Sequence, residues 1–394
     1  LGDIFSPVER ARVQGWFSAV WGFSALAGPL VGGLMVDCLS WRYLFYINLP
    51  LGALALFMVW RCFDERVARR KARVDYLGAV TLTGGMALLL LVLLTGGSQL
   101  PWGSPQIIGM STGAAVLLLL FLWTQGRALD PILPLRLFRI PIIGWGNLSS
   151  LMVGGVMYGT SVYLPIWAQG VQGYSATRSG ASLLWLSIGW PVAAVLGSRL
   201  IVRLGVRPSA LLGLGLNLAG SAGLVALART MAEIPEVLLA LVTFVIGAGM
   251  GFSTLAFILG IQSSVDWAQR GVATASFQFI RTLGGMIWVS AMGGVMNVHL
   301  LGRLQQIPGV DARTTAEAGQ WANRLLDPAG RAALGPELLG AMQDALAAAL
   351  RNVHLMMLLA ALLSLAAALL IPNLRFAPEP ASTVRAGSAG CDAA

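Results

Sequence analysis

One positively charged residue lies inside a long apolar stretch. Arg281 is the only charged side chain of Val272–Val298, and at helical spacing it shares a face with Gln278. In a membrane-spanning helix an arginine at this depth is costly, so we expect its guanidinium to face protein or a cavity. Two interpretations stay open: Arg281 and Gln278 belong to a transmembrane pathway or gate, or Arg281 is a structural hydrogen-bond anchor between helices.

Polar and aromatic side chains recur on one face of a second apolar run, Ile142–Trp167. The members of this face are Asn147, Leu151, Gly154, Tyr158, Ser161 and Pro165. A mixed wall of this kind suits a cavity that accepts amphipathic ligands. Packing between helices, with the polar groups satisfied, is the alternative. Gln262, at the inner end of the run Val237–Gly260, is a further candidate for the same pathway.

A third run, Trp16–Val36, has a face rich in glycine and proline. This face comprises Ser24, Gly28, Pro29, Gly32 and Gly33. Glycines four residues apart let another helix approach closely, and the proline bends its own helix. A bent helix with a glycine face suits two bundles that rock against each other, although ordinary close packing explains the same residues.

The sequence has no arrangement typical of a catalytic or metal site. Its three cysteines, Cys38, Cys62 and Cys391, are too scattered for a disulfide framework or a metal cluster. Its two histidines, His299 and His354, are interpreted as structural or interfacial residues at the outer border. One lysine and no Walker pattern exclude a nucleotide-driven pump within this sequence. We therefore expect no metal, no cofactor and no enzymatic activity.

Ten apolar runs, each long enough to cross a bilayer, would position these residues. The composition is 57% hydrophobic and 11% charged, whereas an ordinary globular protein has roughly 25% charged residues, and a spanning helix needs about 20 apolar residues. The predicted fold class is therefore all-α, a polytopic membrane helix bundle. The runs are Trp16–Val36, Tyr43–Cys62, Tyr76–Thr95, Ile107–Thr124, Ile142–Trp167, Ser182–Val202, Ala210–Ala228, Val237–Gly260, Val272–Val298 and Val353–Ile371.

The arginines between these runs predict the orientation. Alternate loops, assigned to two sides, place most arginines on one side, which is therefore cytoplasmic, as are both termini. Its loop anchors include Arg10, Arg12, Arg203 and Arg207. The opposite short loops hold only Arg42, Arg178 and Arg229. The net charge of +9 is thus topological, and we expect a multi-pass protein of the inner or plasma membrane that binds no nucleic acid.

The order of several motifs resembles the major facilitator superfamily. These motifs are Asp3–Arg12, the glycine–proline run, Trp41–Gly52, Gly247–Gly251, Arg270–Ser276 and Arg281–Gly285. More narrowly, the chain resembles the 14-helix drug:proton antiporter branch of EmrB/QacA type. Its glycine–proline run is similar to the antiporter motif of that branch, with Ser24 where the pattern has its first glycine.

This resemblance implies a domain organisation. The ten runs would correspond to family helices five to fourteen, so the sequence, which starts at Leu1, is expected to be partial and to lack the first four helices. Residues 1–62 would end an N-terminal bundle, and residues 63–140 would hold an extra central helix pair with a basic linker. Residues 141–372 would form a six-helix C-terminal bundle, with a long outer loop at about 299–352 that contains an amphipathic helix over Glu337–Asn352. Residues 373–394 would be a disordered cytoplasmic tail.

The resemblance also implies a function. We expect a secondary active transporter that moves amphipathic drugs or other small molecules outward, coupled to protons, by alternating access between two bundles within the lipid bilayer, and that contributes to antibiotic resistance. A narrow-substrate exporter of a metabolite or antibiotic, or an inactive truncated membrane protein, remains an alternative, and a periplasmic adaptor stays an open question. Because no Asp or Glu lies near the middle of any run, the coupling carboxylate is expected in the missing helices.

Overall fold

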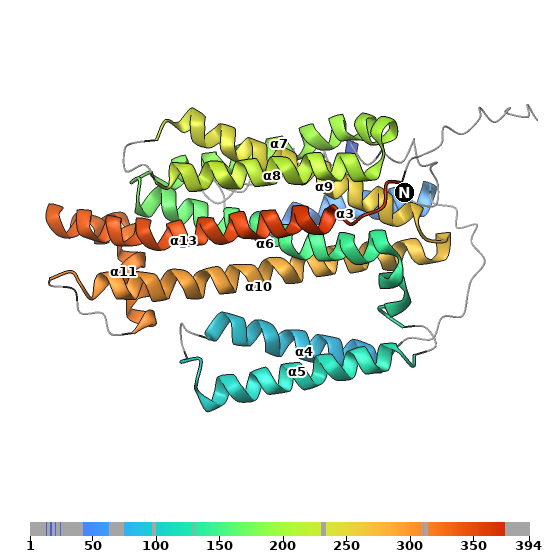
Figure 1. The fold of residues 1–394 in the computed structure, drawn as a ribbon, viewed down its shortest axis with the longest axis horizontal. Helices are drawn as coiled ribbons and strands as arrows, with labels where there is room; N and C mark the ends of the chain where they lie inside the picture. The colour runs from blue at the N-terminus through green and yellow to red at the C-terminus, as the bar shows by residue number, and fades with distance from the viewer. Residues whose placement is uncertain are drawn as a thin grey trace, which may run out of the picture.

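The structure, a computed structural model, is built from helices throughout the part of the chain that it describes (Figure 1). The described residues are Val13, Trp16, Phe17, Val20, Ser24, 42–62, 75–96, 100–128, 131–229, 234–308, Val310 and 314–374. Eight helices in these residues are long and apolar enough to cross a membrane. The predicted all-α membrane bundle is therefore confirmed.

The helices follow one another in this order. They are α2 Tyr43–Tyr46, α3 Asn48–Cys62, α4 Tyr76–Thr95, α5 Pro105–Gln125, η1 Leu135–Arg139, α6 Pro141–Gly170, α7 Ala176–Leu204, α8 Val206–Leu227, α9 Glu236–Ser263, η2 Trp267–Gln269, α10 Arg270–Leu304, α11 Thr315–Leu326, α12 Pro328–Ala332 and α13 Pro336–Ala368.

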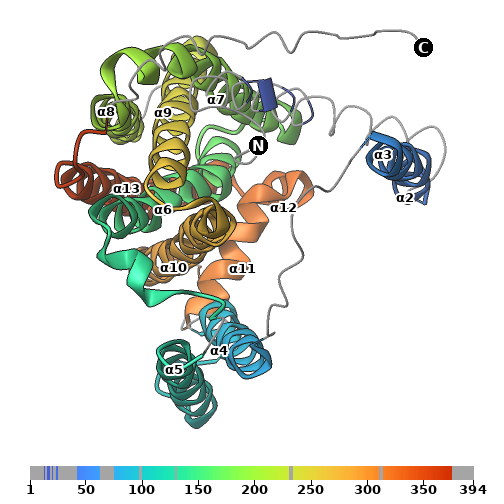
Figure 2. The same cartoon turned by 90° about the vertical axis from the view of Figure 1, so that its right-hand side faces the viewer.

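Six of the long helices form one bundle. The helix α9 packs between α7 and α8, and α6 packs between α10 and α13, while α13 also contacts α8 and α10. Figure 2 shows this bundle from its end, with α9 and α6 near its centre. Large apolar side chains such as Leu196, Leu212 and Leu241 remain exposed on its outside, and lipid tails solvate such surfaces as well as protein does.

Local sequence signals set where these helices begin. The Asp75 carboxylate accepts a hydrogen bond from the Gly78 backbone N–H over 2.8 Å, which caps α4. Ser104 caps α5 in the same way, and a proline follows it at the first helical position. Between α7 and α8 the chain reverses at Gly205, whose φ of +94° is a conformation that other residues rarely adopt.

The helices α4 and α5 form a separate pair beside the bundle. They pack along each other, and α4 touches α10 (Figures 1 and 2). The Gln125 side chain fastens one end of the pair: its Nε2 donates to Asp75 Oδ2 over 2.6 Å, and its Oε1 accepts from the Leu133 backbone N–H over 2.8 Å. One buried glutamine therefore joins α4, α5 and the segment that leads into η1.

Eight of the ten predicted spans, from Tyr76–Thr95 onward, correspond to the eight long helices. Of Trp16–Val36, only Trp16, Phe17, Val20 and Ser24 lie within the described residues. The run Tyr43–Cys62 is divided into α2 and α3, of which α3 has 15 residues. The side chains of α3 from Asn48 to Arg61 are all exposed.

The connection before the last helix differs from the predicted outer loop at 299–352. The helix α10 continues to Leu304, and α13 begins at Pro336, so the predicted amphipathic helix and the last span form one helix of 33 residues. Pro336 fits the first turn of a helix, where its missing N–H is not needed, and for that reason it starts the helix. Much of the shorter connection folds into α11 and α12.

Candidate functional site

The side chain of Arg281 lies where three helices meet. Its Nη1 donates a hydrogen bond to Thr254 Oγ1 of α9 over 3.2 Å. Its guanidinium carbon lies 5.5 Å from the centre of the Trp190 ring of α7 and 5.9 Å from that of Phe277 on its own helix. Both rings are within the range in which an aromatic face attracts a cation. Arg281 thus connects α10 to α7 and α9 at mid-depth in the bundle.

Glycines bring the backbones of these helices together. At Gly154 of α6 a Cβ atom would collide with the backbone carbonyl of Arg281, and at Gly251 of α9 it would collide with that of Trp190. A single added methyl group would therefore push α6 from α10, or α9 from α7. The position of the Arg281 side chain depends on these close approaches.

Thr254 and Trp190 are residues that the sequence analysis missed. Their contacts with Arg281 join segments far apart in sequence, which helical periodicity within one run cannot reveal. The distance of these residues from the ends of their helices could have indicated them, however. Trp190 and Thr254 lie within α7 and α9, well away from the helix ends, as Arg281 does within α10.

Of the residues predicted to share a pathway with Arg281, Tyr158 lies near it in the structure and Gln278 faces outward. Gln278 is exposed, and its backbone carbonyl accepts a hydrogen bond from Thr282 Oγ1 over 3.0 Å. Tyr158 of α6 lies against Gly285, one turn along α10 from Arg281. The structure therefore places Tyr158 next to the Arg281 region.

The predicted polar stripe of α6 is in part a packing surface. Leu151, Gly154 and Tyr158 face the backbone of α10 at Gly284, Arg281 and Gly285. Asn147 is buried, and its Nδ2 donates to the Ile143 carbonyl of its own helix over 2.8 Å. Its Oδ1 has no hydrogen-bond partner among the described residues. Ser161, near the other end of the stripe, is exposed.

Gln262 lies at the turn between α9 and α10, away from Arg281. Its Nε2 donates to Thr274 Oγ1 over 3.2 Å, and its backbone carbonyl accepts from Arg270 Nε over 3.1 Å. From Arg270 to Arg281 the helix rises about 16 Å at roughly 1.5 Å per residue. Gln262 therefore stabilises the turn and does not contact the Arg281 side chain.

The other predicted residues lie near the helix ends or outside the described residues. The latter are Arg10, Arg12, Gly28, Pro29, Gly32 and Gly33. Ser24 Oγ donates to the Val20 carbonyl over 2.9 Å. Arg203 is exposed near the end of α7, and Arg207 Nη2 donates to the Leu369 carbonyl at the end of α13 over 2.8 Å.

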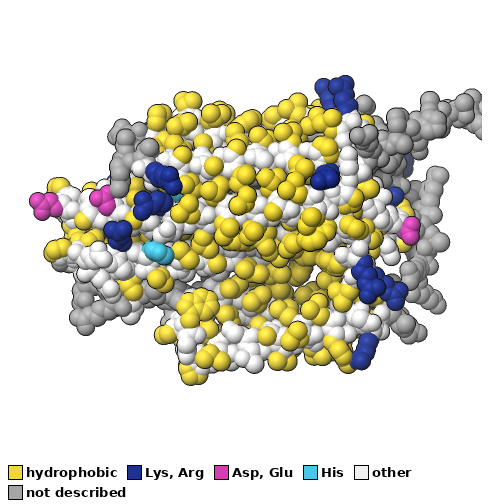
Figure 3. Space-filling model, viewed as in Figure 1, with side chains coloured by type: hydrophobic (Ala, Val, Ile, Leu, Met, Phe, Trp, Pro, Cys, Tyr) yellow, Lys and Arg dark blue, Asp and Glu magenta, His cyan; other side chains and the backbone are white. Residues whose placement is uncertain are grey.

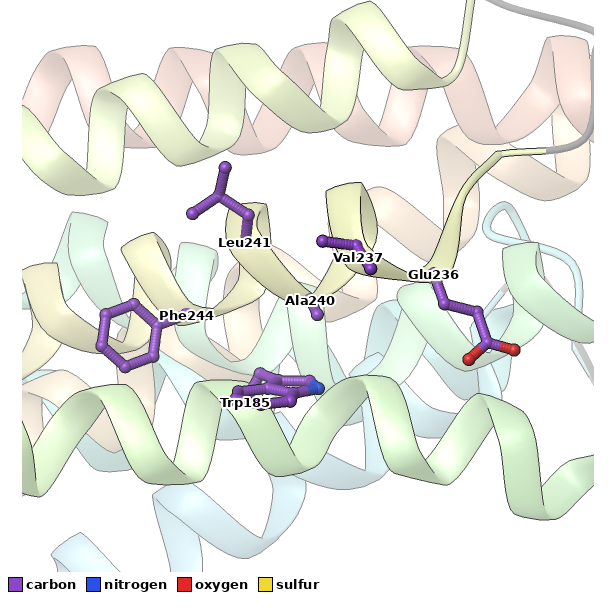
Figure 4. A pocket seen from close by; sticks show the side chains of 6 residues that line it. All are labelled: Trp185, Glu236, Val237, Ala240, Leu241 and Phe244. Atoms are coloured by element: carbon purple, nitrogen blue, oxygen red, sulfur yellow. The ribbon is translucent and has the colours of Figure 1, made fainter.

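A hollow of about 410 Å³ lies between α7 and α9 near their first turns (Figure 4). Trp185 comes from α7, and Glu236 and Phe244 come from α9. The Glu236 carboxylate forms an ion pair with Arg178, whose guanidinium carbon lies 3.9 Å from the centre of the Tyr174 ring. This apolar hollow therefore has a neutralised carboxylate at its edge.

His354 is buried inside the bundle. Its ring is 1% exposed and meets the Trp167 ring of α6 edge to face, with 6.2 Å between the ring centres. Neither ring nitrogen has a hydrogen-bond partner among the described residues. The predicted span put His354 one residue after its start at Val353, whereas α13 begins 17 residues earlier, at Pro336.

The side chains around Arg281 are of types suited to binding a ligand. Within the described residues no three His, Cys, Asp or Glu side chains come together as a metal site would require. A half-buried guanidinium, a hydroxyl and an indole can hold an anionic or polar group and can stack an aromatic one. A carboxylate presented by a facing helix would also pair with this guanidinium.

Comparison with known proteins gives one family. A family model described as the Major Facilitator Superfamily matches residues 1–289. Multidrug transporter protein MdtP of Bacillus subtilis is 32% identical over 76% of this chain and 55% of its own length. Multidrug resistance protein 3 of the same organism is 30% identical over 74% of this chain and 57% of its own length. Efflux pump aunC of Aspergillus niger is 31% identical over 81% of this chain and 62% of its own length. The chain thus spans a little over half the length of these curated relatives.

Proposed function

Because the chain belongs to the major facilitator superfamily, whose members matched here are transporters and not enzymes, we propose that it takes part in proton-coupled export of amphipathic small molecules. The export would proceed by alternating access, in which two helix bundles rock about a central binding site. The names of the relatives, a multidrug transporter and an efflux pump, support an outward direction and a broad cargo.

The observation that carries this proposal is the meeting of α7, α9 and α10 at Arg281. A charge at mid-depth in an apolar bundle is a functional site by default, because its burial is costly. Thr254 and Trp190 hold the guanidinium from two other helices. A movement of α10 relative to α7 and α9 would change these contacts, and this makes Arg281 suitable as part of a gate.

The same proposal assigns the helices to a larger plan. The helices α6 to α10 with α13 would be the C-terminal bundle, and α4 with α5 would be the extra pair of a 14-helix antiporter. Their partner bundle would include family helices outside this sequence, in keeping with the greater length of the relatives. In the described spans no carboxylate lies near mid-depth, so the coupling carboxylate would come from that partner bundle.

The orientation follows from the charges. The ends of α5, α7 and α9 and the start of α10 would lie in the cytoplasm, in the inner or plasma membrane. At the helix ends and in the described connections, this side would include Arg127, Arg136, Arg139, Arg199, Arg203, Arg207 and Arg270. The other side would include Arg42, Arg178 and Arg229, with Arg324 and Arg331 in the long connection before α13, which counts weakly for orientation.

Efflux measurements in cells test the proposal. Cells that express the intact protein are loaded with ethidium, a fluorescent lipophilic cation, and its loss is followed with and without a protonophore. We expect faster loss than in cells without the protein, and we expect the protonophore to abolish the difference. Export that continues at the same rate with the protonophore would contradict proton coupling.

A further inference from the structure

A crevice separates the α4–α5 pair from the six-helix bundle. Its volume is about 340 Å³, and its lining is almost wholly apolar. The lining includes Leu82 of α4, Phe121 of α5, Leu135 and Phe138 of η1, and Phe279 and Leu283 of α10. Because α4 touches α10 only narrowly, no side chain of the described residues fills this space.

The short helix η1 gives the crevice a basic edge. A 3₁₀ helix has three residues per turn, so residues three apart lie on the same face. Leu135 and Phe138 therefore share the face that lines the crevice, whereas Arg136 and Arg139 share another face and are exposed. Figure 3 shows Lys and Arg side chains at this end of the pair, where it meets the bundle.

The pair carries another interfacial feature at the same end. The Arg127 guanidinium carbon lies 3.9 Å from the centre of the Trp123 ring near the end of α5. Tryptophan and arginine are typical of the level of the lipid headgroups. The basic edge of the crevice is therefore at headgroup depth, and its apolar lining extends from there toward the bilayer centre.

We propose that this crevice is a binding site for an anionic phospholipid, with an acyl chain against Phe279 and Leu283 and the phosphate on Arg136 and Arg139. An acyl chain in this space gains dispersion contacts with the apolar lining, and acyl chains are the abundant apolar groups of a membrane. The two arginines select a negatively charged headgroup. The lipid would join the pair to the bundle, a role distinct from that of the proposed gate at Arg281.

Lipid retention measured by native mass spectrometry tests this site. The purified intact protein is titrated with dioleoyl phosphatidylglycerol and with dioleoyl phosphatidylcholine, which have the same chains and different headgroups. We expect tighter binding of the phosphatidylglycerol. In the double variant R136Q/R139Q that affinity should fall about 25-fold, because each basic side chain contributes roughly a factor of five. The matched variant R199Q/R203Q, which removes two exposed arginines at the end of α7, should keep it.

A second pair of variants tests the acyl chain. Leu283→Trp fills the crevice without changing charge and should weaken both lipids. Leu212→Trp, at an exposed position of α8, which does not line the crevice, should weaken neither. Dihexanoyl phosphatidylglycerol, which has the headgroup and only short chains, should bind much more weakly than the long-chain lipid. Equal affinity for the two headgroups, unchanged binding in R136Q/R139Q, or full binding of the short-chain lipid would each overturn the proposal.

Discussion

Replacing Arg281 with methionine separates the two roles that this residue could have. Methionine keeps an unbranched apolar stem and removes the charge. The lost hydrogen bond to Thr254, which involves a charged donor, is worth about 1.5–3 kcal/mol. Burial of an arginine at the centre of a spanning helix costs about 2.5–3.5 kcal/mol on insertion scales. The two terms nearly cancel, so we expect the free energy of unfolding to change by no more than about 1 kcal/mol.

Transport should respond very differently to Arg281→Met. Loss of a hydrogen bond made by a charged donor, such as that from Arg281 to Thr254, costs about 2 kcal/mol, and every 1.4 kcal/mol is a factor of about ten. We therefore expect the ethidium export rate to fall about 30-fold or more, at an unchanged amount of inserted protein.

The assay compares export rate and thermal unfolding in wild type, Arg281→Met and Arg199→Met. Arg199 is exposed near the end of α7, so its replacement removes an arginine without touching the proposed gate. Wild-type export by Arg281→Met would refute the role in the pathway. A loss of stability of more than about 3 kcal/mol, with export falling only in proportion to the folded protein, would show a structural anchor instead.

Three further predictions concern stability and are checked by thermal unfolding of the purified protein. Gly285→Ala places a methyl group against the Tyr158 ring of α6 and should destabilise the protein by about 1–3 kcal/mol. Gly294→Ala on the same helix, where a Cβ has no neighbour within 4 Å, should leave stability unchanged. Equal effects of the two substitutions would contradict the close approach of α6 and α10. His354→Leu replaces a buried ring whose nitrogens have no hydrogen-bond partner among the described residues, so it should stabilise the protein by about 1–3 kcal/mol. Replacement of the exposed His299 with leucine should have little effect. A loss of stability in His354→Leu would reveal a hydrogen bond by way of water. Gln125→Leu leaves the Asp75 carboxylate and the Leu133 backbone N–H without their shared partner and should destabilise the protein by about 2 kcal/mol. An unchanged melting temperature would show that this link does not fasten the α4–α5 pair.

Hydropathy was enough to predict the spans, because each membrane helix must satisfy its own backbone within one continuous apolar segment. For this reason the runs from Tyr76–Thr95 onward correspond to observed helices. The start of the last helix was less accessible. Pro336 begins α13 well before the apolar run, since a helix can extend beyond the hydrocarbon with polar side chains.

The partners of Arg281 could not be predicted in the same way. That Arg281 needed a partner followed from the cost of its charge. Which helices supply Thr254 and Trp190 depends on how α7 and α9 pack, and that packing depends on glycines such as Gly251. The polar stripe of α6 shows the same limit, because the contact of Tyr158 with Gly285 depends on how α6 packs against α10.

Transport by the purified intact protein in liposomes tests the central claim most directly. The lumen is made acidic relative to the outside, so that outward proton flow can drive a lipophilic cation inward through an antiporter, and no nucleotide is present. We predict that ethidium accumulates in the lumen, that a protonophore abolishes the accumulation, and that Arg281→Met reduces its rate about 30-fold. Equal uptake with and without the pH gradient would contradict proton-coupled exchange.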